Sequence, residues 1–158
     1  MIHETVEIRK SPGTLTIADS ATLHKDVLLD LVKQGAVLTI GEYANIGRRT
    51  VIACSELVEI GDYVMIAPDV YIFDADHSYQ NIETPILYQP LTKAKHLKIG
   101  KNSWIGIHAV ILDSVGQGCV IGANSVLTKP TGDYEVWVGS PAKCVKKYNQ
   151  STNKWENT

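Results

Sequence analysis

The chain has 158 residues, of which 44% are hydrophobic and 20% charged, and its formal net charge is -2. This length suits one domain with a real core, which we expect to span residues 1–158. The near-neutral charge gives no argument for nucleic acid or an anionic membrane as a partner, and no apolar run is long enough to span a membrane. The N-terminus lacks the apolar core of a signal peptide, so the sequence predicts a cytoplasmic location.

Much of the chain is built from six-residue units, each opened by an aliphatic residue. The first, IADSAT (17–22) and LHKDVL (23–28), are weak; the clearest are IGEYAN (40–45), IGRRTV (46–51), IGDYVM (60–65), IAPDVY (66–71), IGKNSW (99–104), IGIHAV (105–110) and IGANSV (121–126). A period of six fits neither an amphipathic helix nor an alternating strand, but is typical of a parallel β-helix. We expect the opening residue and the small or β-branched fifth residue of each unit to point inward. An ordinary β-sandwich is the structural alternative.

Two short departures interrupt this period. Two extra residues lie between Leu57 and Ile60, and they predict a widened corner. The step from Ile111 to Ile121 is two residues short of two units, and it predicts a corner that is cut, over residues 113–118.

The longest departure lies between Ile72 and Ile99, where the sequence predicts a loop excursion over about residues 73–96. Insertions in solenoids commonly mark the functional face. This one begins with the polar stretch FDADHSYQN (73–81), continues with the partly apolar stretch ETPILYQP (83–90), and ends in a basic stretch with Lys93, Lys95 and Lys98. The apolar residues in its middle suit it to cover a neighbouring surface.

The three cysteines, Cys54, Cys119 and Cys144, form no C-x-x-C pair. The spacing therefore suggests neither a disulfide framework nor a zinc cluster. We expect all three to pack as small apolar residues.

Residues 99–148, which run from IGKNSWIGIHAV to GSPAKCVKKY, are similar to the C-terminal coils of the hexapeptide-repeat acyltransferases. The closest resemblance is to sugar and polysaccharide O-acetyltransferases, such as the maltose, galactoside and colanic-acid-type enzymes. It implies an all-β fold, a left-handed parallel β-helix with repeats over about residues 15–140 and a C-terminal segment over 141–158. It also implies a homotrimer with active sites between subunits.

The activity that this resemblance implies is transfer of an acetyl group from acetyl-CoA to a hydroxyl of a sugar or cell-surface polysaccharide precursor. The family's catalytic histidine usually sits where a loop leaves the coil, and His77 occupies that place. A histidine suits a general base because its pKa lies near neutrality. A carboxylate would orient it, from Asp74 or Asp76, although either aspartate could instead bind a substrate hydroxyl. Tyr79 is a further candidate for substrate contact.

Several residues of the C-terminal coils are candidates for binding coenzyme A. Trp104 and Gly106 resemble family positions near the cofactor, although Trp104 could equally pack at a subunit interface. Small side chains at Ala109, Ala123 and Ser125 would let the ligand approach. The remaining candidates match the family's segments beside coenzyme A or could meet its phosphates: Thr128, Lys129, Pro141, Lys143 and Lys146.

Three other functions stay open at this point. An amino-sugar N-acetyltransferase could use the same histidine on an amine. A γ-class carbonic anhydrase would bind zinc through three histidines, but the chain lacks that family's H-x-x-x-x-H pattern, so we expect no metal. We expect His96 to be structural and His108 to face outward. A non-catalytic trimeric scaffold is the third alternative. The polar tail, residues 151–158, is expected to be disordered.

Overall fold

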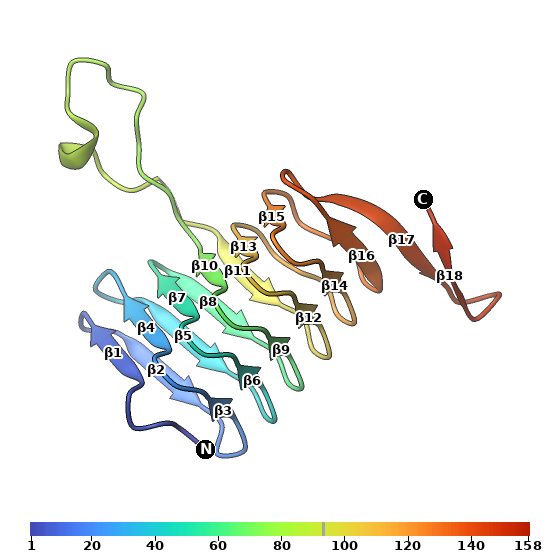
Figure 1. Ribbon diagram of the computed structural model, residues 1–158. Coiled ribbons are helices and arrows are strands. Elements are labelled where there is room, and N and C mark those ends of the chain that lie inside the picture. Colours follow the sequence, from blue (N-terminus) through green and yellow to red (C-terminus); the bar gives the residue numbers. More distant parts are fainter. Residues whose placement is uncertain (93) are drawn as a thin grey trace.

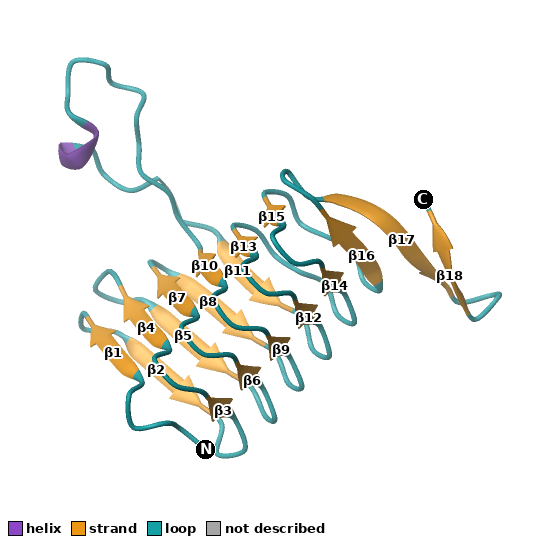
Figure 2. Ribbon diagram, in the orientation of Figure 1, coloured by secondary structure: helices purple, strands orange, loops and turns teal. Residues whose placement is uncertain are grey.

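A computed structural model describes residues 1–92 and 94–158, so Lys93 lies outside the described residues. The chain winds as a parallel β-helix with three flat faces, and one long excursion projects away from it (Figure 1). Strands dominate, and the only helical element in the described parts is the short turn η1 (Ile86–Tyr88) within the excursion (Figure 2). The predicted parallel β-helix is confirmed.

Each face is a sheet whose strands come from successive coils. Face 1 contains β1 (Glu7–Lys10), β4 (Leu28–Leu31), β7 (Val51–Cys54), β10 (Tyr71–Phe73), β13 (Val110–Ile111) and β15 (Val126–Leu127). Face 2 contains β2 (Thr14–Ile17), β5 (Val37–Ile40), β8 (Leu57–Ile60) and β11 (His96–Ile99). Face 3 contains β3 (Thr22–Leu23), β6 (Asn45–Ile46), β9 (Met65–Ile66), β12 (Trp104–Ile105), β14 (Val120–Ile121), β16 (Glu135–Val138), β17 (Lys143–Asn149) and β18 (Lys154–Asn157). The corners are named by the faces that they join, in chain order: 1–2, 2–3 and 3–1.

The core consists of aliphatic columns that run along the helix axis. On face 3, Leu23, Ile46, Ile66, Ile105 and Ile121 lie in register on successive coils, and each is at most 1% exposed. Faces 1 and 2 carry equivalent columns, so every coil buries its apolar side chains against the coil on either side. Burial of one such side chain contributes roughly 1.5–3 kcal/mol.

The corners also follow the period. The fifth residues of the units are buried as expected, including Ala44, Thr50, Val64 and Ala109. The fourth residues have a left-handed backbone at most of the 2–3 and 3–1 corners, with φ between 55° and 60° at Asp26, Tyr43, Arg49, Tyr63, Asp69, Asn102, His108, Asn124 and Tyr134. Residues other than Gly, Asn and Asp adopt this conformation at a cost of about 1 kcal/mol or more.

The two short departures from the period do not form the corners that we expected. Val58 and Ile60 both point inward from β8, so the extra residues lengthen strands, and the corner at residues 55–56 stays tight. Between Ile111 and Ile121 it is face 2 that is shortened. Only an isolated bridge between Ile99 and Val115 remains of that face in this coil.

The excursion leaves the coil at the 1–2 corner, after β10 ends at Phe73, and returns where β11 begins at His96. The predicted range is thus confirmed. Its first residue, Asp74, is 1% exposed. One oxygen of the Asp74 carboxylate accepts the N–H of Ser55 at 2.7 Å, and the other accepts those of Glu56 and Leu57 at 2.7 and 3.0 Å. Asp74 therefore holds the corner of the preceding coil together.

The C-terminal segment reverses the direction of face 3. β16 is parallel to β14, but β17 and β18 pair antiparallel and extend the sheet beyond the last coil (Figure 1). The tail is therefore ordered in β18, contrary to our expectation, because β18 pairs with β17 and the Trp155 ring packs edge-on against Tyr148 at 5.5 Å between ring centroids.

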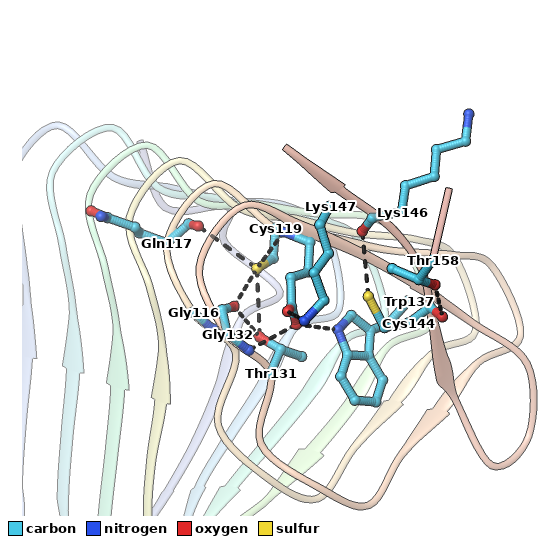
Figure 3. Close-up of polar contacts among 11 residues, drawn as sticks. Gly116, Gln117, Cys119, Thr131, Gly132, Trp137, Cys144, Lys146, Lys147 and Thr158 are labelled. Carbon is cyan, nitrogen blue, oxygen red and sulfur yellow. Dashed lines mark hydrogen bonds and ion pairs between the residues drawn. The ribbon is translucent and has the colours of Figure 1, made fainter. Parts of the chain in front are cut away.

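A buried carboxylate ties this segment to the last coil. Glu135 is 5% exposed, and its carboxylate accepts hydrogen bonds from the Gly132 N–H at 2.8 Å, from the Trp137 indole N–H at 2.8 Å and from Lys147 Nζ at 2.7 Å. The surrounding network also includes Cys119 (Figure 3). Burial alone would raise the pKa of Glu135, but these donors outweigh it and hold the pKa below its ordinary value.

Two of the three cysteines pack as buried apolar residues, as we expected. Cys54 and Cys119 are free and buried, whereas Cys144 is only partly buried in β17. Burial, with a smaller contribution from the Asp74 charge, raises the pKa of the Cys54 thiol to about 11. Cys54 is therefore an inert packing residue at neutral pH.

We predict that Asp74→Ala lowers the free energy of unfolding by about 3 kcal/mol or more, because three backbone N–H groups lose their acceptor in a buried corner. Urea denaturation measures this loss. Asp76→Ala is the matched control, since the exposed Asp76 carboxylate accepts only the neighbouring His77 N–H, and it should change stability by less than about 1 kcal/mol. Equal losses in the two variants would contradict the role given to Asp74.

We also predict that Glu135 makes stability depend on acidic pH. Because its pKa is lower in the folded chain than in the unfolded chain, its contribution is complete above the unfolded value of about 4.3 and disappears as the pH falls through the folded value. Thermal unfolding between pH 6 and 3 should therefore show a smaller loss of stability in Glu135→Gln than in the wild type. Glu83→Gln, in the excursion, should keep the wild-type profile. A Glu135→Gln profile parallel to wild type would be evidence against this role.

Candidate active site

The base of the excursion forms a narrow neck that fixes the position of His77. His77 and Leu91 form an isolated antiparallel bridge between the outgoing and returning strands of the excursion. One step closer to the coil, the Thr92 N–H donates to the Asp76 carbonyl at 2.7 Å, and the Asp76 N–H donates to the Thr92 hydroxyl at 2.9 Å. The neck therefore holds the backbone of His77 in place, although the rest of the excursion extends away from the coil.

The His77 imidazole itself is exposed, and no side chain in the described parts of this chain hydrogen-bonds its ring. The Asp76 carboxylate accepts the backbone N–H of His77 at 2.8 Å instead of the ring. Tyr79, further out on the excursion, is 66% exposed. The imidazole is thus presented to solvent, and none of the described side chains of this chain orients it.

Asp74 does not have the role that the sequence suggested. Its carboxylate is buried, and both oxygens accept backbone N–H groups from the preceding coil. It can therefore neither bind a substrate hydroxyl nor reach His77, and both expectations for Asp74 are wrong. The reason is that the Asp74 side chain turns back to the corner of the preceding coil, although the excursion begins at this residue.

A small cavity of about 240 Å³ lies beside the neck at the 1–2 corner. It brings Asp76, Thr92 and Lys95 together with Leu112 and Thr128 from the later coils. Lys95 Nζ contacts the Asp113 carboxylate at 2.7 Å. One of the expected cofactor residues, Thr128, therefore lies close to the base of the excursion.

Three expected cofactor contacts are structural residues. Ala109 and Ser125 are fully buried fifth-place residues that point into the core. The Ser125 hydroxyl accepts the Gly139 N–H at 3.0 Å. At Gly106, an added Cβ would lie 2.6 Å from the Ala123 backbone nitrogen, so glycine there allows two coils to approach. Any contact of these residues with coenzyme A would therefore be through their backbone, and their role in binding it stays a prediction.

The other candidates are exposed on the C-terminal coils: Trp104, Ala123, Thr128, Lys129, Pro141, Lys143 and Lys146. Some of them approach one another, because the GSPAK segment runs beside β15. The Val126 N–H donates to the Gly139 carbonyl at 3.0 Å, and the Ala142 N–H donates to the Val126 carbonyl at 2.8 Å. Thr128 and Lys129 follow this strand directly, so they lie near the segment that contains Pro141.

Trp104 lies elsewhere, on face 3, where its ring lines a groove of about 610 Å³. Apolar walls come from Met65, Ala67 and Pro68, and the basic residues Lys25 and Arg48 stand at the adjoining 3–1 corner. His3, His24 and Asn45 complete the polar side. The combination of an apolar wall and basic residues suits an extended ligand with anionic groups.

Sequence reasoning missed the two basic residues of this groove. Lys25 and Arg48 hold the third place of their units, as do Pro68 and Ala123, and this place forms one column along the 3–1 corner. Aligning the units by place, and not only by their aliphatic residues, would have found the column.

Ion pairs join neighbouring coils at the corners. Arg49 donates two hydrogen bonds to Asp69, at 2.7 and 2.6 Å, which lower the pKa of that carboxyl. His108 is exposed, as expected, and its Nε2 lies 3.8 Å from the same carboxylate. On face 2, His96 contacts Glu59 of the previous coil, in keeping with the structural role expected for it.

His77 and Trp104 lie on different sides of the chain. The excursion that carries His77 leaves at the 1–2 corner, whereas β12 with Trp104 belongs to face 3, on the opposite side of the prism (Figure 1). The candidate base and the candidate cofactor contact therefore do not share a site within one chain.

Within residues 1–92 and 94–158, no group of three His, Cys, Asp or Glu side chains is arranged to hold a metal ion. No helix in the same residues has the length and apolarity needed to cross a membrane.

Comparison with known proteins identifies the repeat. The bacterial transferase hexapeptide (six repeats) family matches residues 96–129. A Mycobacterium tuberculosis protein named as a probable acetyltransferase is 38% identical over 153 residues, which are 96% of this chain and 50% of that protein, so the chain spans about half the length of this relative. WbbJ of Escherichia coli, named as an O-acetyl transferase of lipopolysaccharide biosynthesis, is 28% identical over 93% of this chain and 79% of its own length.

Solved structures agree with this relationship. The polySia-specific acetyltransferase NeuO has a TM-score of 0.75 and 28% identity over 90% of this chain and 65% of its own. A galactoside acetyltransferase in complex with coenzyme A has a TM-score of 0.73 and 27% identity over 87% of this chain and 66% of its own. The N-acyltransferase AntD from Bacillus cereus, with a TM-score of 0.79 but 23% identity over 96% of this chain and 81% of its own, shares the fold.

The repeat period, the three-faced coil with its excursion and these relatives agree with one another. The chain carries the bacterial transferase hexapeptide repeat and is similar in sequence and in fold, a left-handed parallel β-helix, to the hexapeptide-repeat acyltransferases.

Proposed function

We propose that this chain transfers an acetyl group from acetyl-CoA to a hydroxyl of a sugar or of a cell-surface polysaccharide precursor. The observation that carries this proposal is the neck of the excursion, which holds the backbone of His77 beside the coil and leaves its imidazole exposed. Support comes from the relatives, whose names include an O-acetyl transferase of lipopolysaccharide biosynthesis and a galactoside acetyltransferase in complex with coenzyme A.

In this proposal, His77 acts as a general base. Its neutral imidazole accepts the proton of the acceptor hydroxyl while that oxygen bonds to the thioester carbonyl carbon. His77 then returns the proton to the sulfur as the carbon–sulfur bond breaks, so that the acetyl ester and free coenzyme A are formed. A positioned base of this kind contributes about 10²–10⁴-fold to the rate. The ring is exposed in the single chain, which leaves it accessible to an acceptor.

In this proposal the acyl donor binds across the groove on face 3 and the C-terminal coils. The groove on face 3 offers Trp104 and Met65 for the pantetheine chain and the basic residues Lys25 and Arg48 for phosphates. Thr128, Lys129 and the GSPAK segment lie along β15, and Lys143 and Lys146 follow on β17. A backbone N–H at a corner would stabilise the oxyanion, as in other acyl transfers.

We further propose that the active enzyme is a homotrimer with sites between its subunits. His77 and Trp104 lie on different sides of one chain, so both can serve a single site only if a neighbour supplies one of them. The excursion supports the same conclusion. Ile82, Leu87 and Tyr88 are 92%, 78% and 77% exposed on it, and apolar groups so exposed usually mark a surface that a partner covers.

The acceptor is proposed to be a hydroxyl because two proteins above 25% identity are named as an O-acetyl transferase of lipopolysaccharide biosynthesis and as a galactoside acetyltransferase. The structural neighbour named as an N-acyltransferase shares only the fold, so an amino sugar remains the alternative acceptor. A panel of matched hydroxyl and amino sugars distinguishes the two. Because acetyl-CoA is a cytoplasmic metabolite, we place the reaction in the cytoplasm.

We predict that His77→Ala reduces turnover at least about a hundredfold and leaves coenzyme A binding unchanged. Calorimetric titration with coenzyme A alone measures the binding, and we expect saturation near one per chain. Acetylation of a sugar panel measures the turnover. His108→Ala is the control, because His108 lies at a corner beside Asp69 and not on the neck.

Near-normal turnover in His77→Ala would remove His77 from the mechanism. Failure of the wild type to bind millimolar coenzyme A would overturn the proposed function itself, and a non-catalytic trimeric scaffold would then be the better explanation.

A second prediction tests the shared site. His77→Ala and Trp104→Ala should each be nearly inactive, but their co-expression should restore activity, because some interfaces combine His77 of one subunit with Trp104 of its neighbour. Random mixing in a trimer restores up to roughly a quarter of the wild-type sites. Mixing the two purified proteins under conditions that prevent subunit exchange should restore nothing. Failure of co-expression to rescue activity, with mixed trimers present, would place both residues in the same subunit's site.

A further inference from the structure

A second groove, which the proposed mechanism does not use, runs across the outside of face 2 to the 2–3 corner. Its volume is about 830 Å³. One end is formed by His96, the residue at which the excursion rejoins the coil, and the other by corner residues of successive coils. The side chains with polar groups along it are Thr39, Glu59, Asp62, His96, Lys98, Lys101, Ser114, Gln117, Thr131 and Asp133.

The lining is polar and nearly balanced in charge. Three carboxylates face two lysines and His96, and several of these groups are already paired. His96 contacts Glu59, and the Asp133 carboxylate accepts the backbone N–H and the amide N–H of Gln117 at 3.0 and 3.1 Å. Such a surface offers many hydrogen bonds. Because its positive and negative charges nearly balance, it would not attract a polyanion. It therefore suits an uncharged ligand rich in hydroxyl groups.

Aromatic rings stand beside the groove at the 2–3 corner. Tyr43 and Tyr63 stack on each other with ring centroids 5.0 Å apart and an interplanar angle of 13°. They remain 56% and 61% exposed, and Tyr63 directly follows Asp62 of the groove. Tyr134 continues the column further along the helix axis and is 36% exposed. Tyrosine combines an apolar face with a polar tip, which matches the two characters of a sugar ring.

The backbone at these tyrosines is unfavourable for them. Tyr43, Tyr63 and Tyr134 have φ of 56°, 56° and 55°, in the left-handed region. Asn102 and Gly118, at the same place on the coils between, are residue types that adopt this region readily. Strain of this kind clusters at ligand sites. Folding alone would favour Asn or Gly at this corner, so the three tyrosines point to a function of their side chains.

The face-2 groove is also a surface that the shared site leaves free. The residues assigned to that site lie on face 3, at the 3–1 corner, along β15 of face 1 and on the excursion at the 1–2 corner. The 2–3 corner belongs to none of these. Subunits that meet through the assigned residues would leave it facing outward.

From these observations we infer that the face-2 groove and its tyrosine column bind an uncharged oligosaccharide segment of the acceptor glycan, away from the unit that is acetylated. The inference deepens the proposed function, on which it rests for the identity of the glycan as acceptor. It makes the acceptor a chain of sugars, because a single sugar at His77 could not also reach the 2–3 corner.

The test compares binding of uncharged oligosaccharides of four to six hexose units with binding of their monosaccharides, by calorimetry without coenzyme A. Tyr43→Asn with Tyr63→Asn removes both rings but places at each corner the residue that Asn102 shows to be tolerated, so the variant should fold. We expect at least a tenfold loss of oligosaccharide affinity. His108→Asn, a left-handed residue at the 3–1 corner, is the matched control and should keep wild-type affinity.

Three results would overturn the inference: no oligosaccharide binding by the wild type, equal affinity in the double variant, or a changed oligomeric state in that variant, which would make the column a subunit or protein contact. Acetylation of a monosaccharide is measured alongside. If it persists in the wild type while the oligosaccharide arm fails, the groove inference is wrong and the proposed function stands. If the wild type acetylates no sugar, the proposed function fails whatever the groove binds.

Discussion

The structure depends on one constraint, the parallel register that places an aliphatic side chain of each coil directly over that of the next. On face 3 the column from Leu23 to Ile121 satisfies this constraint without interruption. Because the coils stack in one dimension, each corner recurs at the same position around the axis on successive coils and becomes a column of surface residues. The excursion, the charged 3–1 corner and the tyrosines of the 2–3 corner are all such columns or insertions into them.

The sequence period was sufficient to predict the core and the excursion, because both follow from where aliphatic residues recur. It was insufficient where the structure depends on contacts between distant residues. The order of β18 comes from pairing with β17 and from packing of Trp155 on Tyr148, which a polar tail does not reveal. The two residues added before Ile60 lengthen β8, because its neighbours on face 2, β5 and β11, are also long strands that pair with it. At the left-handed fourth place, residues that adopt this backbone readily, such as Asn102, Asp69 and Gly118, alternate with Tyr, Arg and His, which rarely do, so the place did not stand out in the sequence.

The candidate site was likewise predictable only in part from the sequence. The place of His77 followed from the period, since it lies where the coil is interrupted. The role of Asp74 did not, because proximity in sequence does not reveal that its carboxylate turns back into the preceding corner. Ala109 and Ser125 were assigned to a ligand for being small, although small residues are equally required inside a tight corner. A candidate base and a candidate ligand groove on opposite sides of one chain are the reason why we propose a site shared between copies.

The reversal of direction at the C-terminus limits how copies of this chain can grow into larger assemblies. A solenoid with open parallel edges at both ends could add further copies end to end and form a fibre. Here the antiparallel hairpin of β17 and β18 follows the last parallel strand of face 3 and is held there through Glu135 and Lys147, so face 3 does not offer the edge of its last coil to an incoming copy. Head-to-tail polymerisation is thereby disfavoured, and association is directed to the sides of the prism, where a closed ring of subunits can form.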